Sequence, residues 1–398
     1  MTSQLKTNIK FAAFMFIAYS CLSVMFSYIV VYLEWIGAES STIGLIIAAS
    51  SAANVLGQVV YGYLGDYVVT IKKILFCCIT VSFILTFFLP FLSDYFVIFV
   101  MIYLIACLAG KPITSLLSSY TAKAGNAFGV NYSAVRAFGS VGYGVSALVI
   151  GRVIIRFGYD FMFYIHSGLL VAAFLMLTLI PEIPIAERKK GSDEQMNMLK
   201  AIKTLFKIPE YFIFIISCFI GLLGVWSCLA LVPLLVTSIG RDSSFLGVVL
   251  FLGSIIEVPM FFLYVYVIKL ANVKTLIAAA LIMFIIRLLS VAIFFSDASV
   301  IFSQMLMGIG FSIFVASYIE YIRKIIPSEL TATAIGVTEA MTGAVANIVG
   351  MLAAGFIVSA FGIRFLFLLA GISAVIGLLI FVIGNYMLSK KGLLIDGQ

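Results

Sequence analysis

Long apolar runs separated by short polar loops constrain what this chain can fold into more than any other feature. A helix that crosses a lipid bilayer needs about 20 predominantly apolar residues. Only 10% of the 398 residues are charged and 64% are hydrophobic, whereas a soluble domain is about one quarter charged. We therefore predict an all-α membrane protein with twelve transmembrane helices, at 9–34, 41–66, 73–93, 96–121, 132–155, 160–181, 210–238, 244–268, 274–296, 299–321, 332–360 and 364–387.

One long polar segment interrupts the apolar runs, between Pro181 and Pro209. It leaves six runs before it and six after it. We therefore predict an N-terminal six-helix bundle over 1–181, a cytoplasmic central loop over 182–208 and a C-terminal six-helix bundle over 209–398.

Lysine and arginine residues fall mostly on one side of the predicted membrane. That side holds both termini, the Lys72–Lys73 pair and the Arg188–Lys190 cluster of the central loop. The other side holds only Arg156, Arg241 and Arg364. Because loops rich in lysine and arginine stay inside the cell, we predict a multi-pass protein of the bacterial inner (cytoplasmic) membrane with both termini in the cytoplasm. The net charge of +7 then reflects topology, and no nucleic-acid partner is predicted.

An internal repeat relates the two predicted bundles. The segment from Gly139 to Phe163 can be laid on the segment from Gly343 to Phe367 with a constant offset of 204 and nine identities in 25 positions. The shared pattern Phe-Gly-x-x-Phe-x-Phe lies between two spans in each bundle. Two related bundles around a central cavity are typical of transporters that work by alternating access.

Polar residues inside the run 132–155 form the first candidate site. In a helix, Arg136, Ser140 and Tyr143 share one face, because they are spaced i, i+4 and i+7. An arginine on a lipid-facing helix is costly, so this face is expected to line a wet cavity. We predict that Arg136, Tyr143 and Ser140 bind substrate.

Lys111 is the second candidate for a substrate contact. It lies between Gly110 and Pro112 inside an apolar run, where proline removes a helix hydrogen bond and glycine allows a bend. Its charge favours an anionic or carboxylate-bearing solute. The alternative is a lysine that snorkels or pairs with a carboxylate.

Three further charges lie within predicted spans, and we assign them to proton coupling: Glu257, Glu339 and Arg287. A charge on the lipid face at mid-bilayer costs about 3 kcal/mol or more, so each should face protein or water. We predict that Glu257 carries the proton and pairs with Arg136. Glu339 is either a second proton site or a structural partner of Arg287 or Lys111. Arg287 itself fits a structural ion pair as well as a coupling role.

A short motif follows the second predicted span. Gly62-x-x-x-Asp66 precedes Lys72-Lys73, and we predict that Gly62, Asp66, Lys72 and Lys73 form a cytoplasmic latch that holds one conformation. The alternative is an ordinary interfacial loop with positive-inside lysines.

These motifs resemble those of a known family. The Gly62–Lys73 segment resembles a loop motif of the major facilitator superfamily, and the Arg136–Tyr143 segment resembles span five of its lactose-permease-like branch. That branch includes oligosaccharide, nucleoside and phenylpropionate proton symporters. The resemblance implies two six-helix bundles related by a pseudo-two-fold axis. It also implies that Arg136 binds solute hydroxyls and that Tyr143 stacks on a solute ring.

The resemblance extends to Glu257 and Arg287, which match an acidic position in span eight and a basic position in span nine of that branch. Two departures limit it. Lactose permease has a carboxylate in span four, where this chain has 111–115 without one, and titratable residues in span ten, where this chain has 304–310 without any. Galactoside specificity and that proton route are therefore not implied.

No enzyme motif is visible in the sequence. It has no phosphate-binding loop of the Walker type, and its single histidine, His166, excludes most acid–base schemes. We predict no enzyme activity, no cofactor and no metal. We predict a monomeric secondary transporter in a lipid bilayer that takes up a sugar, nucleoside or aromatic or organic acid with protons. A proton-driven efflux antiporter and a non-transporting membrane sensor on the same fold are the alternatives.

Overall fold

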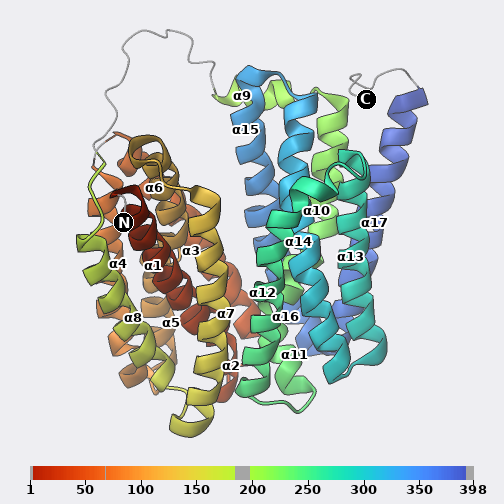
Figure 1. Cartoon of the computed structure of the whole chain (residues 1–398). Coiled ribbons are helices and arrows are strands. Elements are labelled where there is room, and N and C mark those ends of the chain that lie inside the picture. The colour runs from red at the N-terminus through yellow and green to blue at the C-terminus, as the bar shows by residue number, and fades with distance from the viewer. Residues whose placement is uncertain (1–2, 68, 184–197, 391–398) are drawn as a thin grey trace. The chain divides into compact units, whose positions relative to one another are not determined.

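The computed structural model describes residues 3–67, 69–183 and 198–390, and every regular element in them is a helix (Figure 1). Twelve helical segments of this part are long and apolar enough to cross a membrane. The predicted all-α fold with twelve transmembrane helices is therefore confirmed.

The helices fall in two stretches of the chain. The first holds α1 (Ser3–Leu22), η1 (Ser23–Ser27), α2 (Ile29–Trp35), α3 (Ser40–Tyr67), α4 (Ile71–Phe88), η2 (Leu89–Leu92), α5 (Phe96–Gly110), α6 (Ile113–Phe128), α7 (Tyr132–Phe157) and α8 (Phe161–Thr178). The second holds α9 (Met198–Leu205), α10 (Pro209–Ala230), α11 (Val232–Ser238), α12 (Ser243–Val267), α13 (Val273–Phe294), α14 (Asp297–Ile325), α15 (Ser328–Glu339), η3 (Ala340–Val345), α16 (Ala346–Phe361) and α17 (Ile363–Lys390).

Packing groups these helices into two compact units. The first unit comprises Met1–Glu187 and Pro233–Val258, and the second comprises Arg188–Val232 and Pro259–Gln398. The short helix α11 belongs to the first unit, where Thr237 Oγ1 donates a hydrogen bond of 2.9 Å to Glu34 Oε2. This grouping describes packing, and the six-plus-six division at the central loop stays a prediction.

Apart from the 3₁₀ turn η2 at the end of the third span, three of the described spans contain a break in their helical geometry. The break expected at Gly110–Pro112 is present, since α5 ends at Gly110 and α6 begins at Ile113. The other two breaks are the π-helices η1, in the first span, and η3, in the eleventh. π-Helical turns are rare and occur often at functional sites.

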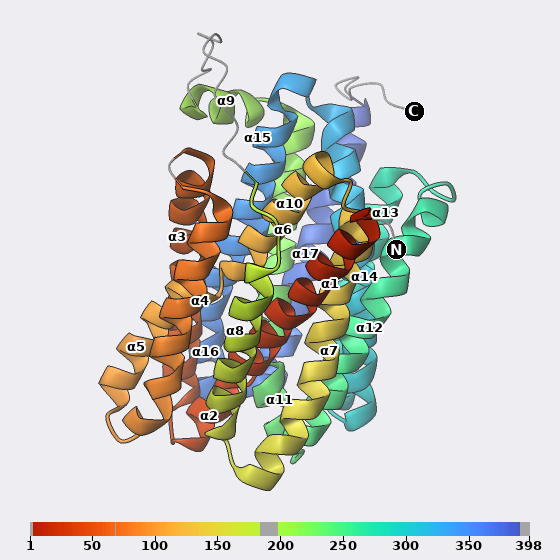
Figure 2. The ribbon, with the colours of Figure 1, turned by 60° about the vertical axis from the view of Figure 1, so that its left-hand side comes forward.

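The first unit is built around α1, which packs on both α7 and α8 (Figure 2). The backbones of α1 and α7 meet at Gly142, where a side chain would collide with the backbone of Phe16. Ser20 Oγ donates to Gly142 O at 3.2 Å across the same crossing. Glycine is therefore what allows α7 to approach α1 so closely.

The repeat seen in the sequence recurs in the backbone. Gly158 follows the last residue of α7, with φ 93° and ψ 167°, and Gly362 follows the last residue of α16, with φ 83° and ψ 164°. In both turns the glycine N–H donates to the carbonyl four residues earlier, at 2.8 and 2.9 Å. The rings that flank each turn also match, with Phe157–Phe161 centroids 5.0 Å apart and Phe361–Phe365 centroids 5.1 Å apart. Each unit thus contains the same turn.

Candidate solute and proton site

Arg136 lies in the second turn of α7 and is half-buried. Its guanidinium lies over the ring of Tyr19, 4.3 Å from the ring centre, and its Nη1 donates to Ser140 Oγ at 3.4 Å. A side chain at Gly139 would touch both Tyr19 and Arg136, so this glycine leaves room for the stack. A cation over an aromatic face is stabilised by about 0.5–2 kcal/mol, more when water is excluded.

Tyr143 lies two turns further along the same helix. Its hydroxyl is 2.7 Å from Ser27 Oγ, so it is hydrogen-bonded to the last residue of η1. The neighbouring Tyr28 is fully buried and donates to Ala147 O at 2.8 Å. Two hydrogen bonds therefore tie the end of the π-helical turn and the residue after it to α7.

Glu257 reaches this region because α12 packs antiparallel to α7. Small residues set the register, since a side chain at Gly247 would meet the backbone at Ala147 and one at Gly144 would meet Phe251 and Ser254. One further turn of α12 brings Glu257 level with Arg136 and Ser140. The carboxylate of Glu257 accordingly lies within electrostatic range of the Arg136 guanidinium and of the neutral side chains of Tyr19 and Tyr143.

Lys111 lies at the break between α5 and α6. Its ammonium group donates to Ser50 Oγ on α3 at 2.8 Å and lies 5.2 Å from the ring centre of Phe26 in η1. A hydroxyl and an aromatic face therefore stabilise this charge, and neither neutralises it.

The first span joins these predicted residues, although none of its own side chains was a predicted site residue. Tyr19 contacts Arg136, Phe26 contacts Lys111 and Ser27 contacts Tyr143. Seven residues separate Tyr19 from Phe26, which corresponds to about 10 Å along a helix. The i, i+7 and i+8 spacing was visible in the sequence, but nothing in an apolar run distinguishes Tyr19 or Phe26 from ordinary packing residues.

Glu339 and Arg287 lie in the second unit, and the contacts described for them differ from the ion pairs considered in the sequence analysis. Glu339 is exposed at the end of α15 and accepts a hydrogen bond of 2.9 Å from the Tyr318 hydroxyl. Arg287 is fully buried in α13, and its Nη1 is in contact with Met307 Sδ. Its Nε and Nη2 have no hydrogen-bond partner among the described residues. Glu339 is therefore held by a tyrosine, and the coupling roles of both residues stay predictions.

The latch residues are only partly described. Gly62 lies within α3 with open space beside it, and the side chain of Asp66 lies outside the described residues. Lys72 Nζ donates to Ile180 O, beyond the end of α8, at 2.6 Å, and Lys73 is exposed. The described contact of Lys72 thus caps a helix end, and the latch stays a prediction.

Comparison with known proteins gives matches along most of the chain. A family model described as the MFS_1 like family matches residues 8–369. The chain is 25% identical over 346 residues to an uncharacterized transporter of Bacillus subtilis (strain 168), YwbF, covering 85% of this chain and 83% of that protein.

Many solved structures share the fold, among them those of two transporters. The nucleoside transporter NupG matches with a TM-score of 0.78 at 19% identity, covering 95% of this chain and 99% of the NupG chain. A D-xylose-proton symporter matches with a TM-score of 0.73 at 13% identity, covering 96% of this chain and 97% of the symporter chain. At such low identities the likeness concerns the fold alone.

Proposed function

Since the chain belongs to the MFS_1 like family and is a multi-pass membrane transporter rather than an enzyme, we propose that it takes up a small organic solute together with protons by alternating access. In this proposal both termini lie in the cytoplasm, the membrane is the cell's inner membrane, and a single chain in the lipid bilayer carries out transport.

The observation that carries the proposal is the cluster of Arg136, Tyr19 and Glu257. It combines a cation, an aromatic ring and a carboxylate inside membrane-spanning helices. Protonation of Glu257 removes its negative charge and frees the guanidinium of Arg136 to bind solute oxygens. Loss of the proton restores the attraction between the two charges and favours solute release. Differential binding of proton and solute to the two states is what couples their movement.

The solute class follows from the chemistry of the same residues. The guanidinium of Arg136 presents several donors in one plane, which suits hydroxyl or carboxylate oxygens. The ring of Tyr143 suits a planar or apolar solute face, and Lys111 suits an anionic group. We propose a sugar, a nucleoside or an aromatic or organic acid. The names of two proteins with this fold, a nucleoside transporter and a D-xylose-proton symporter, support solutes of this size.

Replacing Glu257 by glutamine tests the coupling. Glutamine keeps the shape but cannot exchange a proton, so we expect Glu257→Gln to abolish uptake against a gradient while solute exchange across the membrane persists. The measurement is alkalinisation of a lightly buffered cell suspension on addition of solute, together with uptake of the labelled solute. The control is Glu320→Gln, which removes a carboxylate paired with Arg323 at 3.8 Å. Unchanged proton-coupled uptake in Glu257→Gln would contradict the assignment.

Replacing Lys111 by glutamine tests the anionic contact. We expect Lys111→Gln to raise KM about tenfold for 3-phenylpropionate and to leave KM for 3-phenylpropanamide unchanged, because loss of a charge-assisted hydrogen bond corresponds to about 1.5–3 kcal/mol. Competition of both compounds against solute uptake provides the measurement. Lys203→Gln, at an exposed lysine of α9, is the matched control. An equal change in KM for the acid and for the amide would show that Lys111 does not contact an anionic group of the solute.

The direction of transport has its own test. Uptake with protons predicts alkalinisation of the medium when solute is added. Protection of the cells from toxic compounds on expression, without alkalinisation, would instead support efflux.

A further inference from the structure

His166 lies in α8, deep inside the first unit, and is only 1% exposed. Its Nδ1 is 3.1 Å from the carbonyl oxygen of Cys21 in α1. A carbonyl only accepts, so Nδ1 must carry the proton, and in the neutral ring Nε2 is then an acceptor with a free lone pair. Nε2 has no hydrogen-bond partner among the described residues. This acceptor needs a donor, because a buried polar group left unpaired is costly.

Ser82 in α4 carries a second buried polar group without a hydrogen-bond partner among the described residues. Thr80 and Thr86, on the same helix, both donate to the carbonyl four residues earlier, at 2.8 and 2.7 Å. Ser82 is fully buried, and its hydroxyl has no partner among the described residues. The side chain is accommodated because residue 110 is a glycine, since a side chain there would come within 2.8 Å of Ser82 Oγ.

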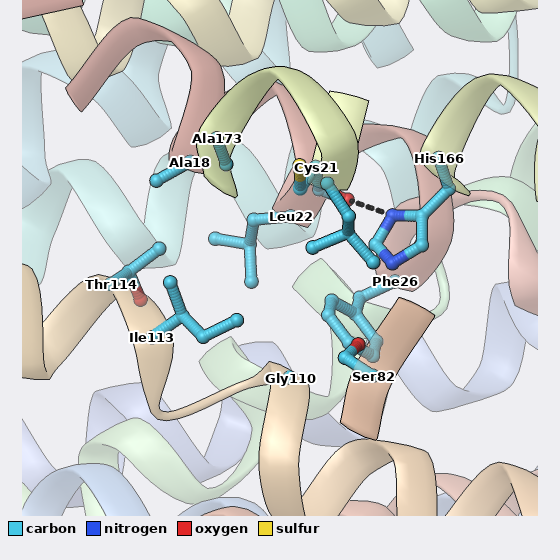
Figure 3. Close-up of a pocket in the computed structure, with 11 residues that line it drawn as sticks. Ala18, Cys21, Leu22, Phe26, Ser82, Gly110, Ile113, Thr114, His166 and Ala173 are labelled. Atoms are coloured by element: carbon cyan, nitrogen blue, oxygen red, sulfur yellow. Dashed lines mark hydrogen bonds between the residues drawn. The ribbon is translucent and has the colours of Figure 1, made fainter. Parts of the chain in front are cut away.

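Both side chains line one small cavity. Figure 3 shows the His166 ring with one nitrogen bonded to Cys21 and the other facing the side on which Phe26 and Ser82 lie. The space open to the centre of a water-sized sphere is about 10 Å³, which is about what a single water molecule needs. The cavity is therefore too small for a solute and sufficient for one water.

Phe26 connects this cavity to the candidate solute site. Its ring meets the His166 ring edge to face, with centroids 6.1 Å apart, and its own face lies below the Lys111 ammonium. Whatever occupies the cavity therefore supports the aromatic ring on which Lys111 rests.

We propose that one ordered water molecule bridges His166 Nε2 and Ser82 Oγ in this cavity and holds Phe26 in place against Lys111. The water donates one hydrogen bond to Nε2 and shares a second with the serine hydroxyl. The water thereby links α8, through His166, to α4, through Ser82, next to Phe26 of the π-helical turn η1. The bridge lies in the interior of the first unit, and its formation does not depend on the direction or solute of transport.

The single histidine makes the test direct. The full-length protein, purified without a histidine tag, is labelled with ¹⁵N only at histidine and placed in lipid nanodiscs. We expect one pair of ring signals from His166, with Nδ1 protonated, Nε2 unprotonated and hydrogen-bonded, and magnetisation transfer to the ring from water protons. A protonated Nε2, or the absence of transfer from water, would overturn the proposal.

A pair of variants locates the second partner. Ser82→Ala removes one of the two anchors, so we expect the Nε2 signal to move toward that of a free imidazole nitrogen. Thr80→Ala removes a hydroxyl from the exposed side of the same helix and should leave the signal in place. Equal signals in the parent and in Ser82→Ala would overturn the bridge. If Ser82→Ala does not fold, the water-transfer measurement on the parent protein decides alone.

The role of Phe26 has a separate readout. With 4-fluorophenylalanine at position 26, the ¹⁹F signal reports the surroundings of that ring. We expect Ser82→Ala to shift or broaden this signal and Thr80→Ala to leave it unchanged. A ¹⁹F signal that is unchanged in both variants would show that the water does not hold the ring of Phe26 in place.

Discussion

At the scale of single residues, Arg136 makes one contact within its own helix and one with a different helix. The contact between Arg136 and Ser140 follows from their spacing of four residues on one helix. The stack of Arg136 on Tyr19 joins residues more than a hundred positions apart. No pattern within either helix specifies that contact, because it depends on how α1 and α7 cross. The roles assigned to these residues stay predictions.

Gly142 provides a stability prediction at this scale. A side chain there would collide with the backbone of Phe16, so we expect Gly142→Ala to destabilise the protein by about 1–3 kcal/mol. Gly168→Ala is the matched control, because Gly168 is exposed on α8 and a methyl group added there would have nothing within 4 Å. Alanine is the better helix former, so the control should unfold at an equal or slightly higher temperature. Thermal unfolding in detergent measures the stability of both variants. Equal melting temperatures for Gly142→Ala and the parent protein would contradict the close approach of α1 and α7 at Gly142.

At the scale of helices, length and apolar composition identified the spans, but not all of their interruptions. The break between α5 and α6 was predictable, because Gly110 and Pro112 both weaken a helix. The π-helix η1 has the sequence Ser-Val-Met-Phe-Ser, with neither glycine nor proline. Its last residue is hydrogen-bonded to Tyr143 of another helix, a contact that the local sequence does not indicate.

The end of α8 illustrates how neighbouring helices stabilise a terminus. Three successive carbonyls there accept from three other helices, at Leu179 from Lys10, at Ile180 from Lys72 and at Pro181 from Tyr120. Because α8 ends at Thr178, these three carbonyls follow the helix and have no partner within it, and donors from α1, α4 and α6 satisfy them. These bonds were not predictable, because the lysines fit a role as topology signals equally well.

Tyr120→Phe tests this arrangement. The variant keeps the ring, which lies 5.7 Å from Phe11, and removes the hydroxyl that donates to Pro181 O at 2.6 Å. We expect a loss of about 1 kcal/mol of stability, as for one hydrogen bond. Tyr386→Phe, at a tyrosine that is 59% exposed, should leave the free energy of unfolding unchanged. Equal melting temperatures for Tyr120→Phe and the parent protein would show that the hydrogen bond from Tyr120 to Pro181 does not stabilise the protein.

At the scale of the whole molecule, the sequence repeat was predictable and the packing units were not. The repeated turn appears in both units with the same backbone geometry. The placement of α11 and most of α12 in the first unit depends on long-range contacts, such as that between Gly247 and Ala147. A periodic pattern along one helix carries no information about such partners.

The repeated turn gives a paired prediction. Gly158 and Gly362 adopt a positive φ with extended ψ, a region that residues with side chains rarely occupy. We expect Gly158→Ala and Gly362→Ala each to destabilise the protein by about 1–3 kcal/mol, and by similar amounts. Thermal unfolding of the two single variants provides the comparison. A loss in only one of them would show that the two turns are not equivalent in the folded protein.

The stack of Arg136 on Tyr19 has a consequence for stereochemistry. One face of the guanidinium is covered by the tyrosine ring, and one of its donors is directed to Ser140. In the proposed solute site, this leaves only the remaining edge or the opposite face of the guanidinium for the acceptors of a solute. With the proposed contact to the ring of Tyr143, few solute orientations allow all of these contacts to form at once. We expect the transporter to distinguish mirror-image forms of its solute.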